Sequence, residues 1–151
     1  MASAISTKKL APNVLRQLWD HDPGATGAVI VSPDGGTTKR VLDLGLYARL
    51  GVAAMATVVV GGITKIEIVA SAAADMSNPV VVKDSGTIAA DASGDWAFLE
   101  CSAEEVKALG DTLRYVAGRV TCANAGDEAA VLYEAYPRFI HGALTPATTI
   151  A

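Results

Sequence analysis

The apolar residues of this chain fall in short runs, and a turn-forming sequence ends nearly every run. The interruptions recur about every 8–12 residues, a spacing typical of antiparallel sandwiches and barrels. In one run Ile66, Ile68 and Ala70 share one face, while Lys65 and Glu67 share the other. This is the alternation of a half-buried antiparallel strand. We therefore predict a mostly β fold: an antiparallel β-sandwich or jelly-roll-like domain of eight or nine short strands.

Three pairs of runs are separated by sequences that favour a tight turn. These pairs predict three hairpins: residues 27–44 around the turn 33–36, residues 46–70 around Gly61 and Gly62, and residues 113–136 around the turn 124–127. Further short strands are predicted at residues 79–83, 86–90 and 95–101.

Two segments have the pattern of a helix. Ser102 and Glu105 form a capping box, in which each side chain bonds the backbone N–H of the other residue. The short capped helix that follows is predicted to end at Gly110, a residue type that favours a helix terminus. Residues 12–20 carry four apolar side chains at helical spacing and predict a second short helix.

The two ends of the chain lack these patterns. We predict an extended N-terminal arm over residues 1–11, a β-sandwich domain over residues 12–140 and a C-terminal tail over residues 141–151. The N-terminus has no apolar core of the kind that marks a secretory signal.

Composition and charge argue against several classes of partner. Hydrophobic residues make up 51% of the chain and charged residues 19%, which is too apolar for a disordered protein. A net charge of −4 argues against a general nucleic-acid binder held by phosphate contacts. The longest uncharged stretch, residues 50–64, is shorter than the roughly 20 residues of a transmembrane helix. We expect no direct nucleic-acid partner and no membrane partner.

The residues that usually carry chemistry are few and scattered. His21 lies beside Asp22 in a Pro-Gly turn, and His141 stands alone. Cys101 and Cys122 do not complete a set of four zinc ligands with these histidines. We therefore expect no enzyme activity, no cofactor and no bound metal. The two cysteines are interpreted as buried free thiols that act as small hydrophobes, although strands that place them side by side would allow pairing.

A compact β domain with extended ends and no chemical cluster is typical of a binding or assembly protein. We expect a homo-oligomer, either a dimer or a trimer. The predicted partner interface combines the basic spot of the arm, one tryptophan and the residues where the tail begins. These residues are Lys8, Lys9, Leu10, Trp19, Tyr136, Arg138 and Phe139.

Several stretches of the sequence resemble small virion proteins of tailed bacteriophages. The stretches are residues 66–72, 95–105 and 113–121, together with 123–128 and its continuation at 136–139. The resemblance covers roughly residues 60–140, and these proteins look like capsid decoration (cement) proteins with a β-sandwich or jelly-roll core. It carries no motif of functional residues.

The resemblance implies a role on the capsid surface of a virion, after synthesis in the host cytoplasm. Such a protein binds the assembled shell of the major capsid protein, bridges neighbouring capsomers and stabilises the shell by mass action.

Two alternatives remain open. One is a head–tail connector or tail structural subunit that forms a ring in the same kind of particle. The other is a soluble ligand-binding or carbohydrate-binding β-sandwich, in which aromatic side chains line a groove. The candidates for such a groove are Trp19, Trp96, Tyr47, Tyr115, Tyr133 and Tyr136.

Overall fold

The computed structural model describes residues 15–21, 27–30 and 41–137, with side chains described over residues 41–137. These residues form a mostly β structure, as the sequence predicts, and contain one short helix. The predicted arm at residues 1–11 and the predicted tail at residues 141–151 lie outside the described residues. The elements in chain order are β1 Leu15–His21, β2 Gly27–Ile30, β3 Leu42–Asp43, β4 Tyr47–Val58, β5 Ile63–Ser71, β6 Val80–Asp84, β7 Trp96–Ser102, α2 Ala103–Leu109, β8 Tyr115–Cys122 and β9 Glu128–Pro137.

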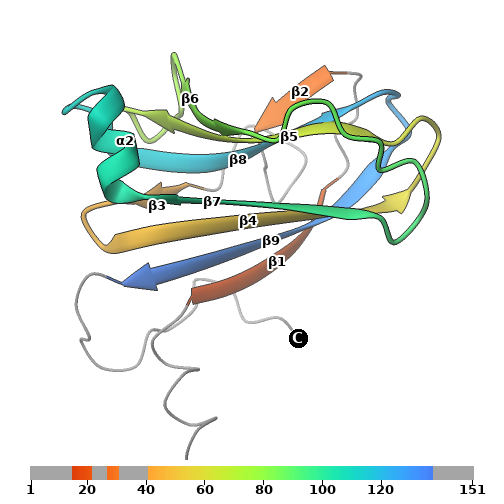
Figure 1. The fold of residues 1–151 in the computed structure, drawn as a ribbon, viewed down its shortest axis with the longest axis horizontal. Helices are drawn as coiled ribbons and strands as arrows, with labels where there is room; N and C mark the ends of the chain where they lie inside the picture. Colours follow the sequence, from red (N-terminus) through yellow and green to blue (C-terminus); the bar gives the residue numbers. More distant parts are fainter. Residues whose placement is uncertain (1–14, 22–26, 31–40, 138–151) are drawn as a thin grey trace, which may run out of the picture.

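The strands form two antiparallel sheets that lie one above the other, with α2 at one end (Figure 1). Sheet A has the strand order β1-β9-β4-β7. Sheet B has the order β2-β8-β5-β6, and β3 also pairs with β8. The side chains that point between the sheets form one shared core. Its larger members are Leu50, Val52, Val131 and Tyr133 from sheet A, and Ile63, Ile66, Ile68, Val116 and Val120 from sheet B.

Small residues allow the two sheets to approach closely. Tyr133 of β9 is fully buried, and its hydroxyl accepts a hydrogen bond from the backbone N–H of Gly118 on β8. A Cβ atom at Gly118 would lie 2.8 Å from Val52 Cγ1 and 3.1 Å from the Tyr133 hydroxyl oxygen. Any side chain at position 118 would therefore push the sheets apart. The abundance of alanine, valine and glycine is consistent with a core made of thin layers.

The three predicted hairpins are all wrong. β4 and β5 belong to different sheets, and so do β8 and β9, so each connection crosses between the layers. β2 and β3 both pair antiparallel with β8, and therefore run in the same direction along one edge. A turn sequence indicates that the chain reverses, but it does not indicate which sheet the next strand joins.

One carboxylate holds the two crossings between β4 and β5 and between β8 and β9. Asp127 Oδ1 accepts hydrogen bonds from the backbone N–H groups of Val60, Gly61 and Gly62 at 2.6, 2.8 and 2.9 Å. Its Oδ2 accepts a bond from the N–H of Asn124 at 2.8 Å. Burial opposes ionisation of this carboxyl, but the four donors outweigh that effect and hold the pKa of Asp127 well below its ordinary value.

The short helix predicted over residues 12–20 is also wrong. Residues 15–21 form β1, which pairs with β9 from Leu15 opposite Ala135 to His21 opposite Ala129. The backbone pairing along β9 depends on residues more than a hundred positions away, so it is invisible to a local pattern.

The capped helix is confirmed as α2. Ser102 Oγ accepts a bond from the N–H of Glu105 at 3.2 Å, and Glu105 Oε2 accepts one from the N–H of Ser102 at 2.8 Å. The helix ends at Gly110, whose N–H donates to the carbonyl oxygen of Lys107. Ala103 and Val106 are buried, so α2 packs its apolar side onto the end of the sandwich.

Candidate binding surface

A buried ion pair lies on the outer face of sheet B. Glu67 points outward from β5, as its alternation predicts, yet it is only 2% exposed. Arg119 Nε donates to Glu67 Oε2 at 2.6 Å, and Lys65 Nζ lies 3.0 Å from Oε1. The bond from Arg119, supported by Lys65 and opposed by burial, holds the pKa of Glu67 below its ordinary value.

The connection between β5 and β6 covers another part of the same face. Met76, in this connection, is 2% exposed and packs on Val69 and Ala117, which are fully buried. Ser71 fixes the segment, because its hydroxyl donates to the carbonyl oxygen of Ser77 at 2.7 Å. The chain therefore covers this part of sheet B with its own residues.

The outer face of sheet A carries exposed apolar side chains instead. Met55 on β4 lies opposite Trp96 on β7, and Ala53 lies opposite Phe98. The exposed fractions are 42% for Met55, 68% for Trp96 and 45% for Phe98. Half-buried Leu132 on β9, opposite Ala53, continues the same row. We call these five residues the apolar band.

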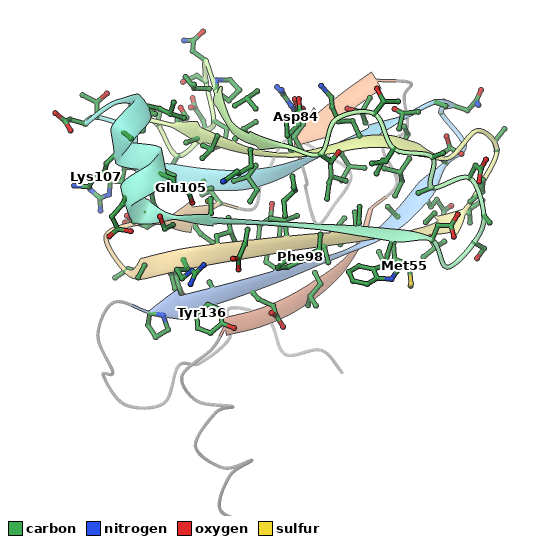
Figure 2. All side chains as sticks on the ribbon, viewed as in Figure 1. Met55, Asp84, Phe98, Glu105, Lys107 and Tyr136 are labelled. Carbon is green, nitrogen blue, oxygen red and sulfur yellow. The ribbon has the colours of Figure 1, made fainter. Side chains whose placement is uncertain are left out.

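The band is a flat surface. A Cβ atom at Gly51 would lie 2.8 Å from Cε2 and 2.9 Å from Cζ of Phe98, so the aromatic ring rests directly over the backbone of β4. Figure 2 shows Met55 and Phe98 along β4 and β7, with Tyr136 farther along the sheet at the end of β9. A flat aromatic surface suits contact with another flat surface better than enclosure of a small molecule.

Polar groups border the band toward the end of the sheet where β9 finishes. Arg49 Nη2 lies 2.9 Å from Glu100 Oε1, and both side chains are more than half exposed. Tyr136 lies opposite Arg49 and is 45% exposed. An apolar centre with a polar border is the usual make-up of a protein interface.

The structure places two of the predicted interface residues. Tyr136 lies exposed at this border. Trp19 lies in β1 opposite Val131, and its side chain is outside the described part. The other predicted residues, Lys8, Lys9, Leu10, Arg138 and Phe139, also lie outside the described residues.

The sequence did not single out Met55 and Phe98, and it named Trp96 only as a possible groove residue. The available signal was the shared parity of Trp96, Phe98 and Glu100, which puts two aromatic residues on the same face as a charged one.

The two cysteines lie in different sheets. Cys101 on β7 and Cys122 on β8 are both buried and free, which confirms the interpretation as free thiols. Burial raises the pKa of Cys101 to about 12 and that of Cys122 to about 11. Both thiols therefore stay protonated at neutral pH and are poor nucleophiles. Among the described residues, no group of three His, Cys, Asp or Glu side chains is placed to hold a metal ion.

A shallow pocket of about 280 Å³ lies between the end of α2 and the β3–β4 turn. Lys107 and Arg114 line it together with Asp111. Asp43 binds the Arg114 guanidinium through two bonds of 2.8 and 2.6 Å, so this cation is already neutralised. The pocket therefore lacks the net positive charge expected of an anion site.

No protein-family model, curated protein or solved structure matches this chain. Within residues 15–21, 27–30 and 41–137, the structure contains no helix long and apolar enough to cross a membrane.

Proposed function

We propose that the protein is a capsid decoration (cement) protein of a tailed bacteriophage, with a structural and not an enzymatic role. It binds the assembled shell of the major capsid protein through the apolar band and stabilises that shell. The observation that supports this most is the exposure of Trp96, Phe98 and Met55 on one sheet face. Clustered exposed apolar side chains bordered by polar groups mark protein interaction sites.

We propose further that the sandwich is a jelly roll. The order β1-β9-β4-β7 in one sheet and β2-β8-β5-β6 in the other supports two interlocked Greek keys, with β2 and β3 as two parts of one strand. Jelly rolls occur in viral capsid proteins and in lectins. The topology therefore supports a virion role only together with the surface and the sequence resemblance, since a fold alone does not determine function.

The mechanism is clamping. A protein that binds only the assembled lattice stabilises it in proportion to the free energy of binding. The band supplies the apolar contact, and Arg49, Glu100 and Tyr136 at its border supply polar contacts that orient it.

The decisive experiment mixes the purified protein with empty shells of the major capsid protein and, separately, with unassembled capsomers. Sedimentation followed by quantitative gel analysis measures the bound copies. We expect binding to the shell alone, with a copy number that rises with the number of capsomers. Binding of a single ring at one vertex would favour the connector or tail alternative and overturn the decoration role.

A matched pair of variants tests the surface. Trp96→Ser removes the most exposed aromatic residue of the band and is expected to weaken shell binding at least about tenfold. Leu109→Ser is the control, because Leu109 is 52% exposed but lies on α2, away from the band. If the two variants bind the shell equally well, the apolar band does not form the contact with the shell.

The exposed aromatic residues also favour a second candidate, a carbohydrate-binding sandwich, since sugars stack on flat aromatic faces. A glycan array followed by titration calorimetry tests it. Saturable binding of one glycan, lost in Trp96→Ser and accompanied by no binding to shells, would replace the decoration role with this one.

A further inference from the structure

β7 is an edge strand among the described residues, and no described strand pairs with its outer side. It pairs with β4 on one side and ends the described order of sheet A. Ala56, which lies opposite Asp95, donates its N–H to the Asp95 carbonyl oxygen. Because antiparallel pairing alternates, Trp96, Phe98 and Glu100 direct their N–H and C=O groups away from β4. Within residues 15–21, 27–30 and 41–137, no strand pairs with these three donors and three acceptors, so another strand can bond to them.

The edge of sheet B that β6 forms is protected. β6 has five residues, carries Lys83 and Asp84, and shows a register shift against β5. β7 has seven residues and keeps a continuous register with β4. Its one charged residue, Glu100, is already paired with Arg49. Long, regular, apolar edges pair readily with other strands, whereas charges and bulges prevent such pairing.

There is room beside this edge. A groove of about 490 Å³ lies at the start of β7 and is lined by residues 88–90 and 94–97. The groove is next to the outward-facing backbone of Trp96, so an incoming strand meets open space there.

We propose that the occupant of this edge is β7 of a second copy of the chain, paired antiparallel about a two-fold axis at Phe98. Phe98 of one copy then lies opposite Phe98 of the other, and Trp96 lies opposite Glu100 of the second copy. The four strands of sheet A in each copy join into one continuous sheet. This inference does not depend on the proposed function, because it concerns self-association in solution.

The side chains favour this register over the two others whose axis passes through an outward residue. An axis at Glu100 would oppose two like charges, which is destabilising. An axis at Trp96 would bring Phe98 opposite Gly94, which lies in a turn with φ +96° and cannot continue the pairing. The axis at Phe98 uses all three outward residues, pairs two aromatic rings and places Trp96 beside the Arg49–Glu100 pair of the other copy.

The dimer brings the two apolar bands together on one face of the joined sheet. A partner that binds both bands gains from the high effective concentration of the second band. Because a two-fold interface uses the same surface on both copies, the assembly closes at two chains.

Charge exchange at the axis tests the register directly. Phe98→Lys and Phe98→Glu each oppose two like charges across the axis, so each alone is expected to be monomeric where the native chain is dimeric. We expect the dissociation constant of the dimer to rise at least about tenfold in each. An equimolar mixture restores a dimer of one copy of each, measured by sedimentation equilibrium. Leu109→Lys and Leu109→Glu are the controls and remain dimeric.

Three outcomes would overturn the proposal: a native chain that is monomeric or trimeric, a dimer that persists in Phe98→Lys, or two monomeric variants that fail to pair when mixed. Circular dichroism checks that each variant folds.

Amide hydrogen exchange of the native chain gives a second test that needs no variant. The N–H groups of Trp96, Phe98 and Glu100 are expected to exchange more slowly at high protein concentration, whereas those of Ala97 and Leu99 are protected at all concentrations. Exchange at Phe98 that does not depend on concentration contradicts the pairing.

Discussion

The outer faces of the two sheets differ in how far their side chains are exposed. Sheet B covers Val69 and Ala117 with Met76, and it neutralises Glu67 with Arg119. Sheet A leaves Met55, Trp96 and Phe98 exposed. The difference teaches that exposure is uneven among the described residues: side chains of the chain itself cover much of one face, and large apolar side chains stay exposed on the other. Paired substitutions on the two faces test this contrast.

The largest expected effect is on the ion pairs. Arg119→Ala leaves the buried Glu67 carboxylate with Lys65 as its one remaining cationic partner among the described residues and is expected to lower the free energy of unfolding by about 3 kcal/mol. Arg49→Ala removes an ion pair that is more than half exposed and should cost about 0.5 kcal/mol or less. Urea unfolding measures both. Equal losses of unfolding free energy would show that the ion pair of Glu67 and Arg119 is not buried.

The two methionines give the next comparison. Met76→Ala creates a cavity above Val69 and is expected to cost about 2–3 kcal/mol. Met55→Ala removes a side chain that is 42% exposed and should cost less than about 1 kcal/mol. The urea midpoints of the two variants, measured under one condition, give both losses of unfolding free energy. A larger loss in Met55→Ala than in Met76→Ala would contradict the expected difference between the two faces.

Acid is expected to weaken sheet B through Glu67. Because the folded-state pKa of Glu67 is below its ordinary value of 4.5, the ion pair stabilises the fold above that pH. The contribution is lost as the pH falls through the lower, folded-state pKa. In Glu67→Gln this component is absent, so its unfolding free energy should fall less steeply with acid than that of the native chain. Protonation of Asp127 lowers the stability of both proteins in the same direction. The difference between their two slopes of unfolding free energy against pH therefore reports Glu67 alone.

The smallest effect on stability is expected at Trp96. Trp96→Phe should change the free energy of unfolding by less than about 0.5 kcal/mol, because the side chain is 68% exposed. The same substitution should remove a component of the fluorescence that acrylamide quenches readily. A large loss of stability would show that Trp96 packs within the chain and is not part of an open surface.

Local structure could be predicted where the signal was local. The capping box at Ser102 and Glu105 fixed the position of α2, and the alternation around Ile66 and Ile68 located β5. The partners of each strand could not be predicted in the same way. Asp127, which holds the crossing from β4 to β5, stands 65 positions after Gly62. A pattern over a few neighbouring residues cannot predict a hydrogen bond between residues so far apart in the sequence.

The candidate surface was predicted only in part, for a related reason. Tyr136 was predicted as an interface residue and is exposed, but Phe98 was overlooked. Trp96 and Phe98 are more strongly apolar than a solvent-facing position usually is, and their outward direction was indicated only by Glu100 on the same face. Glu67 was predicted on the correct face, but its burial depends on Arg119, 52 positions away.

The position of β9 has a consequence for synthesis of the protein on the ribosome. β9 lies between β1 and β4, although it is the last of the described strands to be translated. Until residues 127–137 have emerged, β1 and β4 each expose an edge, and the carboxylate that joins the two crossings is missing. The nascent chain therefore depends on β9, the last of the described strands, to complete these two sheets. During translation its unpaired apolar edges are the segments that most need protection by chaperones.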